Sequence, residues 1–376
     1  MIYFDSAAST KPSKEVLDAY LDAALNNFEN PNSIHKYGMK NFNEINRIKQ
    51  NILRSLRLPS EYEVTFTSGA TESNNLAILG YARRNKNRGK HLITTKVEHE
   101  SVLEVFKQLE KEGFIVSYLD INEEGKIDIE NFKKLFTNDT ILVSMMAVNN
   151  EVGFKLNIED VSKIVRTNPK CVLHTDAAQT LGKYNFNFGV ADLITISGHK
   201  IYGLKGIGAL IRKKKINLEP IFYGGGQENG LRSGTLDYPA IVAFNVACQN
   251  ITKNFKINFE HVNKLHDYLI EELSKIDEVI LHEFKDFSPY VINFSLKTKK
   301  ASVIVEALSN KDIMVSSVSA CNSKKEAISY VLLALGKTEA EAKNAIRLSL
   351  SIENTIDECD AFIKTFKQIL SEIRGR

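Results

Sequence analysis

Short apolar runs alternate with helix-like segments along the first two thirds of the chain. The runs that predict strands cover residues 64–66, 91–94, 115–119, 140–145, 172–175, 194–196 and 208–211. Between them, apolar residues at helical spacing predict helices over 72–82, 101–112, 129–135 and 158–165. This alternation predicts an α/β fold with a mostly parallel sheet. In such a sheet, ligands bind beyond the carboxyl ends of the strands.

The pattern changes after about residue 245. A long helical stretch carries apolar residues at helical spacing, namely Val262, Leu265, Leu269, Ile270 and Leu273. A short predicted strand at 290–296 and further helices follow it. We interpret this part as a smaller α+β domain that the N-terminal residues complete. The expected division is a large domain over 16–250 and a small domain formed by 1–15 and 251–376.

Composition narrows the class of protein. The 376 residues are 43% hydrophobic and 25% charged, with a net charge of +3, which does not indicate a nucleic-acid binder. No apolar run is long enough for a membrane span, and we expect no signal peptide, because Met1–Asp5 already reads as folded sequence. The basic run 212–215 is expected to be a solvated turn between strands.

The cysteines do not indicate a disulfide framework or a metal site. There are four, with no CxxC pair, at Cys171, Cys248, Cys321 and Cys359. We therefore expect no metal and a reducing, cytoplasmic location.

Lys200 follows a buried apolar run, within a segment rich in serine, histidine and glycine (197–208). Burying an ammonium without a partner is unfavourable, so a lysine at a strand end needs a reason. A partly desolvated amine is a nucleophile that can join covalently to an aldehyde cofactor. Taken alone, the segment fits this chemistry and a solvated surface loop equally well.

Other strand ends carry polar residues suited to a cofactor. Segment 67–75 joins a strand to a helix through small residues, which could bind phosphate or form an ordinary N-cap. Asp176 could keep a pyridine nitrogen protonated or could cap a helix. His99 could stack on an aromatic ring or move a proton, although a lone histidine is more often structural.

Three later segments add candidate chemistry. The loop 224–235 combines three glycines with Arg232 and Thr235, which suits a phosphate. A loop exposed to solvent would have the same composition. Cys321 lies among small polar residues, where an exposed thiol can act as a nucleophile; a single cysteine is more often buried. Arg347 lies in strand-like sequence and needs an anionic partner, either a substrate carboxylate or a structural salt bridge.

Together these segments resemble the pyridoxal-phosphate-dependent cysteine desulfurases of the NifS/IscS type, in the class V aminotransferase superfamily. The matching segments follow the family's order over nearly the whole chain, at 3–8, 30–35, 67–75, 98–99, 149–153, 176–179, 197–208, 224–235, 316–321 and 346–347. The resemblance implies the fold type I architecture, with a seven-stranded, mostly parallel sheet in the large domain. It also implies pyridoxal 5′-phosphate as the cofactor.

The resemblance implies a role for each candidate residue. Lys200 would attach the cofactor and move protons at the substrate's α-carbon, with His99 stacked on the ring. Asp176 would pair with the ring nitrogen and Gln179 with the phenolic oxygen. Cys321 would accept the sulfur as a persulfide, with release of alanine. The remaining residues would bind phosphate (Ala70, Thr71, Ser197, His199 and, across a homodimer interface, Thr235) or lie by the cofactor and the substrate carboxylate (Asn150 and Arg347).

The expected reaction removes sulfur from L-cysteine and passes it to an unidentified acceptor protein, for iron–sulfur cluster assembly or tRNA thiolation. The alternatives are a selenocysteine lyase, another enzyme of this superfamily, or an inactive partner in a sulfur-transfer assembly. Cys321 argues against transamination, which needs no thiol. The intact Lys200, Asp176 and His99 argue against an inactive partner.

The chain departs from the family pattern at three places. Val318 stands where glycine is usual, and residues 351–353 (Ser-Ile-Glu) replace the usual Gly-Arg-Phe. Gln227 stands where some members have histidine. We expect the first departure to affect the cysteine loop and the second to affect the domain edge.

Overall fold

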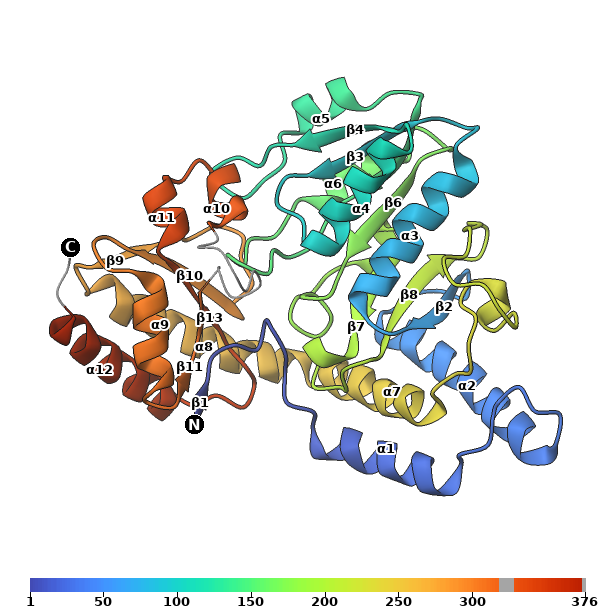
Figure 1. Cartoon of the computed structure of the whole chain (residues 1–376), viewed down its shortest axis with the longest axis horizontal. Coiled ribbons are helices and arrows are strands. Elements are labelled where there is room, and N and C mark those ends of the chain that lie inside the picture. The colour runs from blue at the N-terminus through green and yellow to red at the C-terminus, as the bar shows by residue number, and fades with distance from the viewer. Residues whose placement is uncertain (318–327, 374–376) are drawn as a thin grey trace.

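A seven-stranded sheet forms the centre of one half of the molecule (Figure 1). The structure is a computed structural model that describes residues 1–317 and 328–373. The strand order is β2-β8-β7-β6-β5-β3-β4. β8 runs antiparallel to β2 and β7, and the other neighbours pair in parallel, which confirms the predicted sheet. The strands are β2 (Tyr62–Thr67), β3 (His91–Thr95), β4 (Ile115–Leu119), β5 (Thr140–Ser144), β6 (Val172–Asp176), β7 (Leu193–Ser197) and β8 (Gly208–Lys213).

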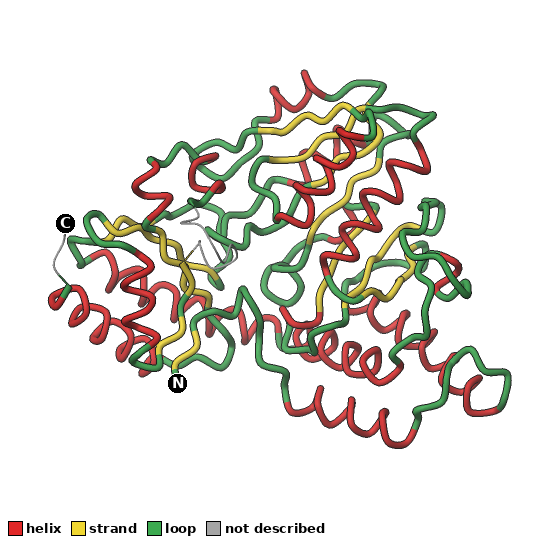
Figure 2. Tube along the Cα trace, viewed as in Figure 1, coloured by secondary structure: helices red, strands yellow, loops and turns green. Residues whose placement is uncertain are grey.

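Helices cover both faces of this sheet, as Figure 2 shows. Successive apolar residues of a strand point to opposite faces, so Ile194 packs in one core cluster and Leu193 in another. The helices that pack in this half are α1 (Lys14–Asn26), α2 (Lys36–Ser55), α3 (Ala70–Asn85), α4 (Glu100–Lys111), α5 (Ile129–Leu135), α6 (Ile158–Val165) and α7 (Tyr238–Lys253). The four helices predicted between the strands are confirmed within a few residues at their ends.

The second half is built on a smaller antiparallel sheet of order β12-β13-β10-β9. Its strands are β9 (Val279–Leu281), β10 (Val291–Leu296), β12 (Ser316–Ser317) and β13 (Ala345–Ser349). The predicted apolar stripe of the long helix α8 (Phe255–Ser274) packs in this core. The other helices are α9 (Ala301–Ser309), α10 (Tyr330–Ala334), α11 (Glu339–Lys343) and α12 (Ile356–Glu372).

The N-terminus belongs with this second core. β1 (Ile2–Tyr3) pairs in parallel with β11 (Ile313–Met314), and Phe4 is buried in the same cluster. Asp5 bridges to Ser349 at the end of β13. The chain then crosses to α1 in the first half, so residues 5–9 run between the two cores (Figure 1).

The basic run 212–215 is not simply a solvated turn, so this prediction is wrong in part. Arg212 is buried at the end of β8 and pairs with Glu63. The Lys213 Nζ lies 3.0 Å from Asp192 Oδ1. Lys214 and Lys215 do form a turn. β8 stays paired with β2 through Arg212 and Lys213. The ion pairs of these two residues allow the strand to continue this far.

Candidate active site

A cavity of about 660 Å³ lies beyond the carboxyl ends of the larger sheet. Its walls come from the residues that follow β2, β3, β5, β6 and β7, together with residues 5–9 and the edge of the smaller sheet. This is the position where ligands bind in open α/β sheets. The sequence candidates that line it are Ala70, Thr71, His99, Asn150, Asp176, Gln179, His199, Lys200 and Arg347.

Lys200 ends a short helical turn, η2 (Gly198–Lys200), directly after β7. A Cβ on Gly198 would lie 2.8 Å from the Leu204 carbonyl oxygen, so the turn can only close this tightly with glycine there. The Lys200 Nζ donates to the carbonyl oxygens of Ala7 and Ala8, at 2.5 and 2.8 Å. The lysine is therefore half-buried at the cavity wall, and the solvated-loop alternative is wrong.

Asp176 ends β6 and is 6% exposed. Its Oδ2 accepts a hydrogen bond from Asn74 Nδ2 at 2.8 Å, and its Oδ1 accepts one from the Ala178 N–H at 2.9 Å. These two hydrogen bonds fix the orientation of the carboxyl group, which lines the cavity and could accept a hydrogen bond from a ligand nitrogen.

His99 is the N-cap of α4, and its Nδ1 accepts a hydrogen bond from the Ser101 N–H at 3.1 Å. This contact assigns the ring proton to Nε2 in the neutral form. The Ser101 hydroxyl accepts from Asn74 Nδ2, the same amide that binds Asp176. Asn74 thus joins the histidine and the aspartate in one hydrogen-bond network.

The start of α3 offers free backbone donors. Gly69, the N-cap residue, has φ 150° and makes no side-chain cap hydrogen bond. The first N–H groups of a helix have no acceptor within the helix, so those of Ala70 and Thr71 face the cavity as donors. The close approach of β8 shapes this turn, since a Cβ on Gly208 would lie 2.8 Å from Gly69 Cα. The N-cap alternative for this segment is therefore the weaker one.

Ser197 and His199 lie beside the same helix start. The Ser197 Oγ and His199 Nδ1 are 3.0 Å apart, and the Ser197 hydroxyl is the atom nearest the missing Cβ of Gly69. Burial and the positive charges of Lys200, Lys205 and Lys183 lower the pKa of His199 to about 4. His199 is therefore neutral at physiological pH and can act as a hydrogen-bond donor without a charge.

Arg347 lies on β13 and has a structural partner already. Its Nη2 donates to Asp5 Oδ1 at 2.8 Å, and its Nη1 donates to the Asn150 carbonyl oxygen at 3.0 Å. Its Nε is buried and has no partner among the described residues. The salt bridge that we considered as an alternative is present, and these contacts use two of the five N–H donors of the guanidinium.

Two predicted residues that the structure describes, Ser197 and Thr235, are not among those that line the cavity, although Ser197 lies beside His199 at its edge. Thr235 is exposed, in the loop that follows η3 (Glu228–Gly230), and does not line the cavity. Cys321 and Val318 lie outside the described residues. Ser316 does line the cavity, as the first residue of β12, and Cys321 is five residues further along the chain.

The other departures from the family pattern lie in packed turns. The Ile352 N–H donates to the Tyr202 hydroxyl at 2.9 Å, which ties segment 351–353 to the turn after Lys200. The Ser351 N–H donates to Asn354 Oδ1 at 2.7 Å. Gln227 Oε1 accepts from the Gly234 N–H at 2.9 Å and so braces the glycine-rich loop.

Sequence reasoning missed three buried polar residues behind the cavity wall. Asn74 joins His99 to Asp176, as described above. Glu98 is fully buried, and Lys183 is 2% exposed and donates to Gln179 Oε1 at 3.0 Å. Asn74 and Glu98 fall within matched segments, so a search for polar residues in those motifs could have found them. Lys183 could have been found because it follows Gln179 by four residues in the sequence.

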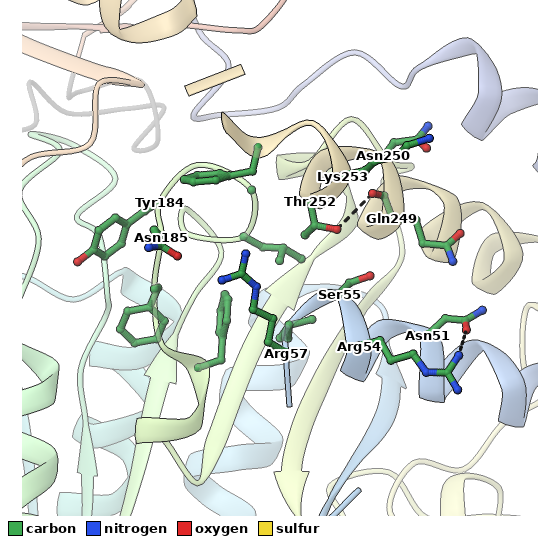
Figure 3. A pocket seen from close by; sticks show the side chains of 16 residues that line it. Asn51, Arg54, Ser55, Arg57, Tyr184, Asn185, Gln249, Asn250, Thr252 and Lys253 are labelled. Atoms are coloured by element: carbon green, nitrogen blue, oxygen red, sulfur yellow. Dashed lines mark hydrogen bonds between the residues drawn. The ribbon is translucent and has the colours of Figure 1, made fainter. Parts of the chain in front are cut away.

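A second cavity, of about 620 Å³, carries no comparable chemistry (Figure 3). It lies between the end of α2, the segment 181–188 and the junction of α7 with α8. Its basic residues include Arg54 and Lys253, in the last turns of α2 and α7. Basic side chains there offset the negative end of a helix, which explains the charge without a ligand.

Two wider properties concern the part of the chain that the structure describes. No three histidine, cysteine or acidic side chains there form a group that could hold a metal ion. Over the same residues, no helix is both long enough and apolar enough to cross a bilayer.

Comparisons with known proteins agree with this fold and cavity. The family model described as "Aminotransferase class-V" matches residues 2–362, so the chain belongs to the class V aminotransferase family. It is 40% identical to "Cysteine desulfurase IscS" of Colwellia psychrerythraea, over 99% of this chain and 93% of the relative. It is 39% identical to the cysteine desulfurase of Homo sapiens, over 99% of this chain and 82% of the relative.

A solved structure described as a NifS-like protein supports the same assignment to a family. It matches with a TM-score of 0.93 at 33% identity, over 99% of this chain and 100% of that one. Within its family, the chain therefore belongs to the cysteine desulfurases, which are enzymes. The expected resemblance, fold class and enzyme class are confirmed.

Proposed function

We propose that the protein uses pyridoxal 5′-phosphate to remove sulfur from L-cysteine, leaving the sulfur as a persulfide on Cys321 and releasing L-alanine. The observation that carries the proposal is one cavity that joins Lys200, Asp176 and Arg347 at the strand ends. The names of the relatives, all cysteine desulfurases, support the same substrate.

The donor set of the cavity fits pyridoxal phosphate. Free N–H groups at the start of α3, with the Ser197 hydroxyl and neutral His199 beside them, suit the phosphate. Asp176 is a carboxylate suited to the ring nitrogen, and Gln179 Nε2 is a donor suited to the phenolic oxygen. A volume of about 660 Å³ is within the range of ordinary ligand sites.

When bound, the cofactor supplies an electron sink that withdraws electrons from the substrate's α-carbon. Asp176 would pair with the ring nitrogen and keep it protonated, which strengthens that sink, and hydrogen bonds from Asn74 and the Ala178 N–H orient its carboxyl group. Lys200 would hold the cofactor covalently and carry protons to and from the α-carbon. His99 would lie against the ring, with its Nε2 proton available for transfer.

Arg347 and Asn150 bind the substrate carboxylate. The guanidinium is fixed in place by Asp5 and by the Asn150 carbonyl oxygen, so it meets the substrate without a further loss of side-chain freedom. Nη1 and Nη2 each keep a second N–H as a charge-assisted donor for the substrate.

The sulfur transfer then balances as a displacement at sulfur. The Cys321 thiolate attacks the substrate's sulfur, an S–S bond forms, and the C–S bond breaks. The electron pair of the C–S bond stays on the substrate's carbon, which takes a proton from the enzyme and leaves as alanine. The persulfide passes its outer sulfur to an acceptor protein, for iron–sulfur cluster assembly or tRNA thiolation.

The active form is a homodimer. Thr235 is exposed and lies outside the cavity of its own chain, which suits a residue that reaches the phosphate of a partner subunit. Phe42, half exposed on α2, shares a cavity with residues of the Thr235 loop. Exposed apolar patches mark interfaces, and other large exposed apolar residues of α1, α2 and the segment between them are Leu17, Leu21, Leu25, Phe28, Ile34, Tyr37 and Met39.

The predicted domains and location belong to the same proposal. A separate core formed by α8, α9, α12 and the smaller sheet supports a small domain of 1–15 and 251–376 beside a large one of 16–250. Cys171, Cys248 and Cys359 are free buried thiols, which supports a reducing, cytoplasmic location.

The decisive variant is Lys200→Ala. The wild-type protein loaded with pyridoxal phosphate should absorb visible light and release alanine and sulfide from L-cysteine when a thiol reductant is present. Lys200→Ala should lose the visible band and the activity, because the covalent link is gone. Lys86→Ala, on an exposed part of the first half, is the matched control. An unchanged spectrum in Lys200→Ala would refute the assigned role of the lysine.

A further inference from the structure

Lys183 is a fully buried lysine directly behind the cavity wall. It is 2% exposed and ranks among the largest wholly enclosed side chains. Lysine is almost never buried to this degree unless a partner accompanies it. The nearby charges that act on it, those of Lys200 and Arg347, are both positive. Ion pairing therefore does not explain its position.

The contacts of the Lys183 amine are an amide oxygen and an aromatic face. Its Nζ donates to Gln179 Oε1 at 3.0 Å. It also lies 5.7 Å from the centre of the Tyr290 ring, whose face attracts a cation. The amine is thus aimed at the one oxygen atom of the Gln179 side chain.

This contact, together with the one that Nε2 makes, sets the orientation of the Gln179 amide. An amine donates to an oxygen, so Oε1 faces Lys183 and the NH₂ end faces the other way. There Nε2 donates to the Ala7 carbonyl oxygen at 2.9 Å, the same oxygen that accepts from Lys200 Nζ. The NH₂ group has a second N–H, and Gln179 lines the cavity, so this donor remains for a ligand.

We propose that Lys183 is a positioning residue that holds the Gln179 amide with its N–H donor toward the cavity. The inference rests on the proposed function, since the partner of that donor is the phenolic oxygen of pyridoxal phosphate. A reversed amide would present Oε1 to that oxygen, and two acceptors would repel each other. Lys183 prevents the reversal without touching the cofactor.

The charged amine orients the amide most strictly, because an ammonium group has donors only. Burial, with the positive charges of Lys200 and Arg347, lowers the pKa of Lys183 to about 7. A neutral amine can still donate to Oε1, and the Ala7 carbonyl oxygen, which accepts from Nε2, continues to oppose a reversed amide after the proton is lost. The cavity wall can therefore hold a second amine near Lys200 without a permanent second positive charge.

The test is a double-mutant cycle of Lys183→Met and Gln179→Ala. Methionine has a similar length and suits a buried site, so it removes the donor and little else. The readouts are the visible absorption maximum of the loaded protein, the pH midpoint of that band, and the dissociation constant of pyridoxal phosphate. With Gln179 present, Lys183→Met should shift the band and its midpoint and weaken binding about tenfold. With Gln179→Ala, it should change none of the three.

The remaining outcomes contradict the proposal. Equal shifts in both backgrounds would show that Lys183 acts independently of Gln179, and no shift in either would show no positioning role. Lys155→Met, a partly buried lysine that does not line the cavity, is the matched control and should resemble the wild type. If the wild-type protein takes up no pyridoxal phosphate, the proposed function is overturned as well. If the wild type takes it up normally and the absorption band of Lys183→Met is not shifted, this inference alone is overturned.

Discussion

Buried polar neighbours, rather than the candidate residues alone, determine how each group in the cavity can act. Asp176 accepts hydrogen bonds from Asn74 and the Ala178 N–H, and Gln179 accepts one from Lys183. Lys200, Asp176 and Arg347, which line the cavity, could be singled out from the sequence because their residue types are chemically distinctive. The residues behind them could not, because an asparagine or lysine has no special pattern until folding brings its partner alongside.

Glu98 gives a testable consequence at this scale. Its Oε1 accepts from Thr95 Oγ1 and from the Met146 N–H, and its Oε2 has no partner among the described residues. Burial raises the pKa of Glu98 to about 8, although these two hydrogen bonds oppose the rise, and the negative charge of Asp176 adds to it. The folded protein therefore keeps this carboxyl neutral at pH 7, whereas the unfolded chain ionises it.

We predict that Glu98→Gln removes a pH-dependent loss of stability. Because the folded pKa lies above the unfolded value, the wild type loses stability as pH rises from about 4.5 to about 8. Glutamine mimics the neutral acid, so the variant should match the wild type near pH 4 and exceed it by about 3 kcal/mol at pH 7. Urea unfolding of the apoprotein across this range measures the difference. Exposed Glu100→Gln is the control, and parallel profiles for the wild type and Glu98→Gln would contradict the prediction.

At the scale of elements, the cavity exists because several strands end at one edge and turn sharply there. Hydrophobic periodicity predicted these strands and helices well, because the central strands β5, β6 and β7 are buried throughout and helices such as α4 and α6 bury one apolar face. The basic run 212–215 misled the same reasoning. Its first two residues extend β8 through ion pairs with Glu63 and Asp192, a contact that depends on distant chain segments.

The turn at Gly69 depends on the absence of a side chain on Gly208. A Cβ there would lie 2.7 Å from the Ile196 carbonyl oxygen and 2.8 Å from Gly69 Cα. Gly208→Ala should therefore push the start of α3 away from β7, weaken pyridoxal phosphate binding about tenfold, and cost about 1–3 kcal/mol in stability. Cofactor titration and urea unfolding measure the two effects. Gly189→Ala, which meets only Asn187 Oδ1 at 3.2 Å, is the control; equal behaviour of the two variants would argue against a special role for Gly208.

At the scale of the whole molecule, the cavity needs both halves and, in our proposal, two chains. Residues 5–9 and Arg347 bring the second core to the strand ends of the first. The sequence could not reveal this closure by pattern, since Asp5 and Arg347 are separated by nearly the full chain. The order of ten family motifs supplied it instead, and the same resemblance predicted Cys321 in a segment outside the described residues.

The dimer is testable through Phe42. Phe42→Asp adds a charge to an exposed apolar position beside the Thr235 loop. If that face meets a second copy, sedimentation should show the wild type as a dimer and the variant as a monomer. The variant should also bind pyridoxal phosphate more weakly, because Thr235 no longer reaches the partner's site. Ile257→Asp, exposed on α8, should remain dimeric; a dimeric Phe42→Asp would contradict the proposed interface.

The central claim is that sulfur from L-cysteine passes to Cys321. Its most direct measurement is mass spectrometry of the cofactor-loaded protein after a short incubation with L-cysteine, without reductant. We predict one additional sulfur atom on the peptide that contains Cys321, and none in Cys321→Ala, which should keep its visible absorption band. Sulfur found instead on Cys171, Cys248 or Cys359, or an unmodified Cys321 in a protein that still releases alanine and sulfide, would contradict the account.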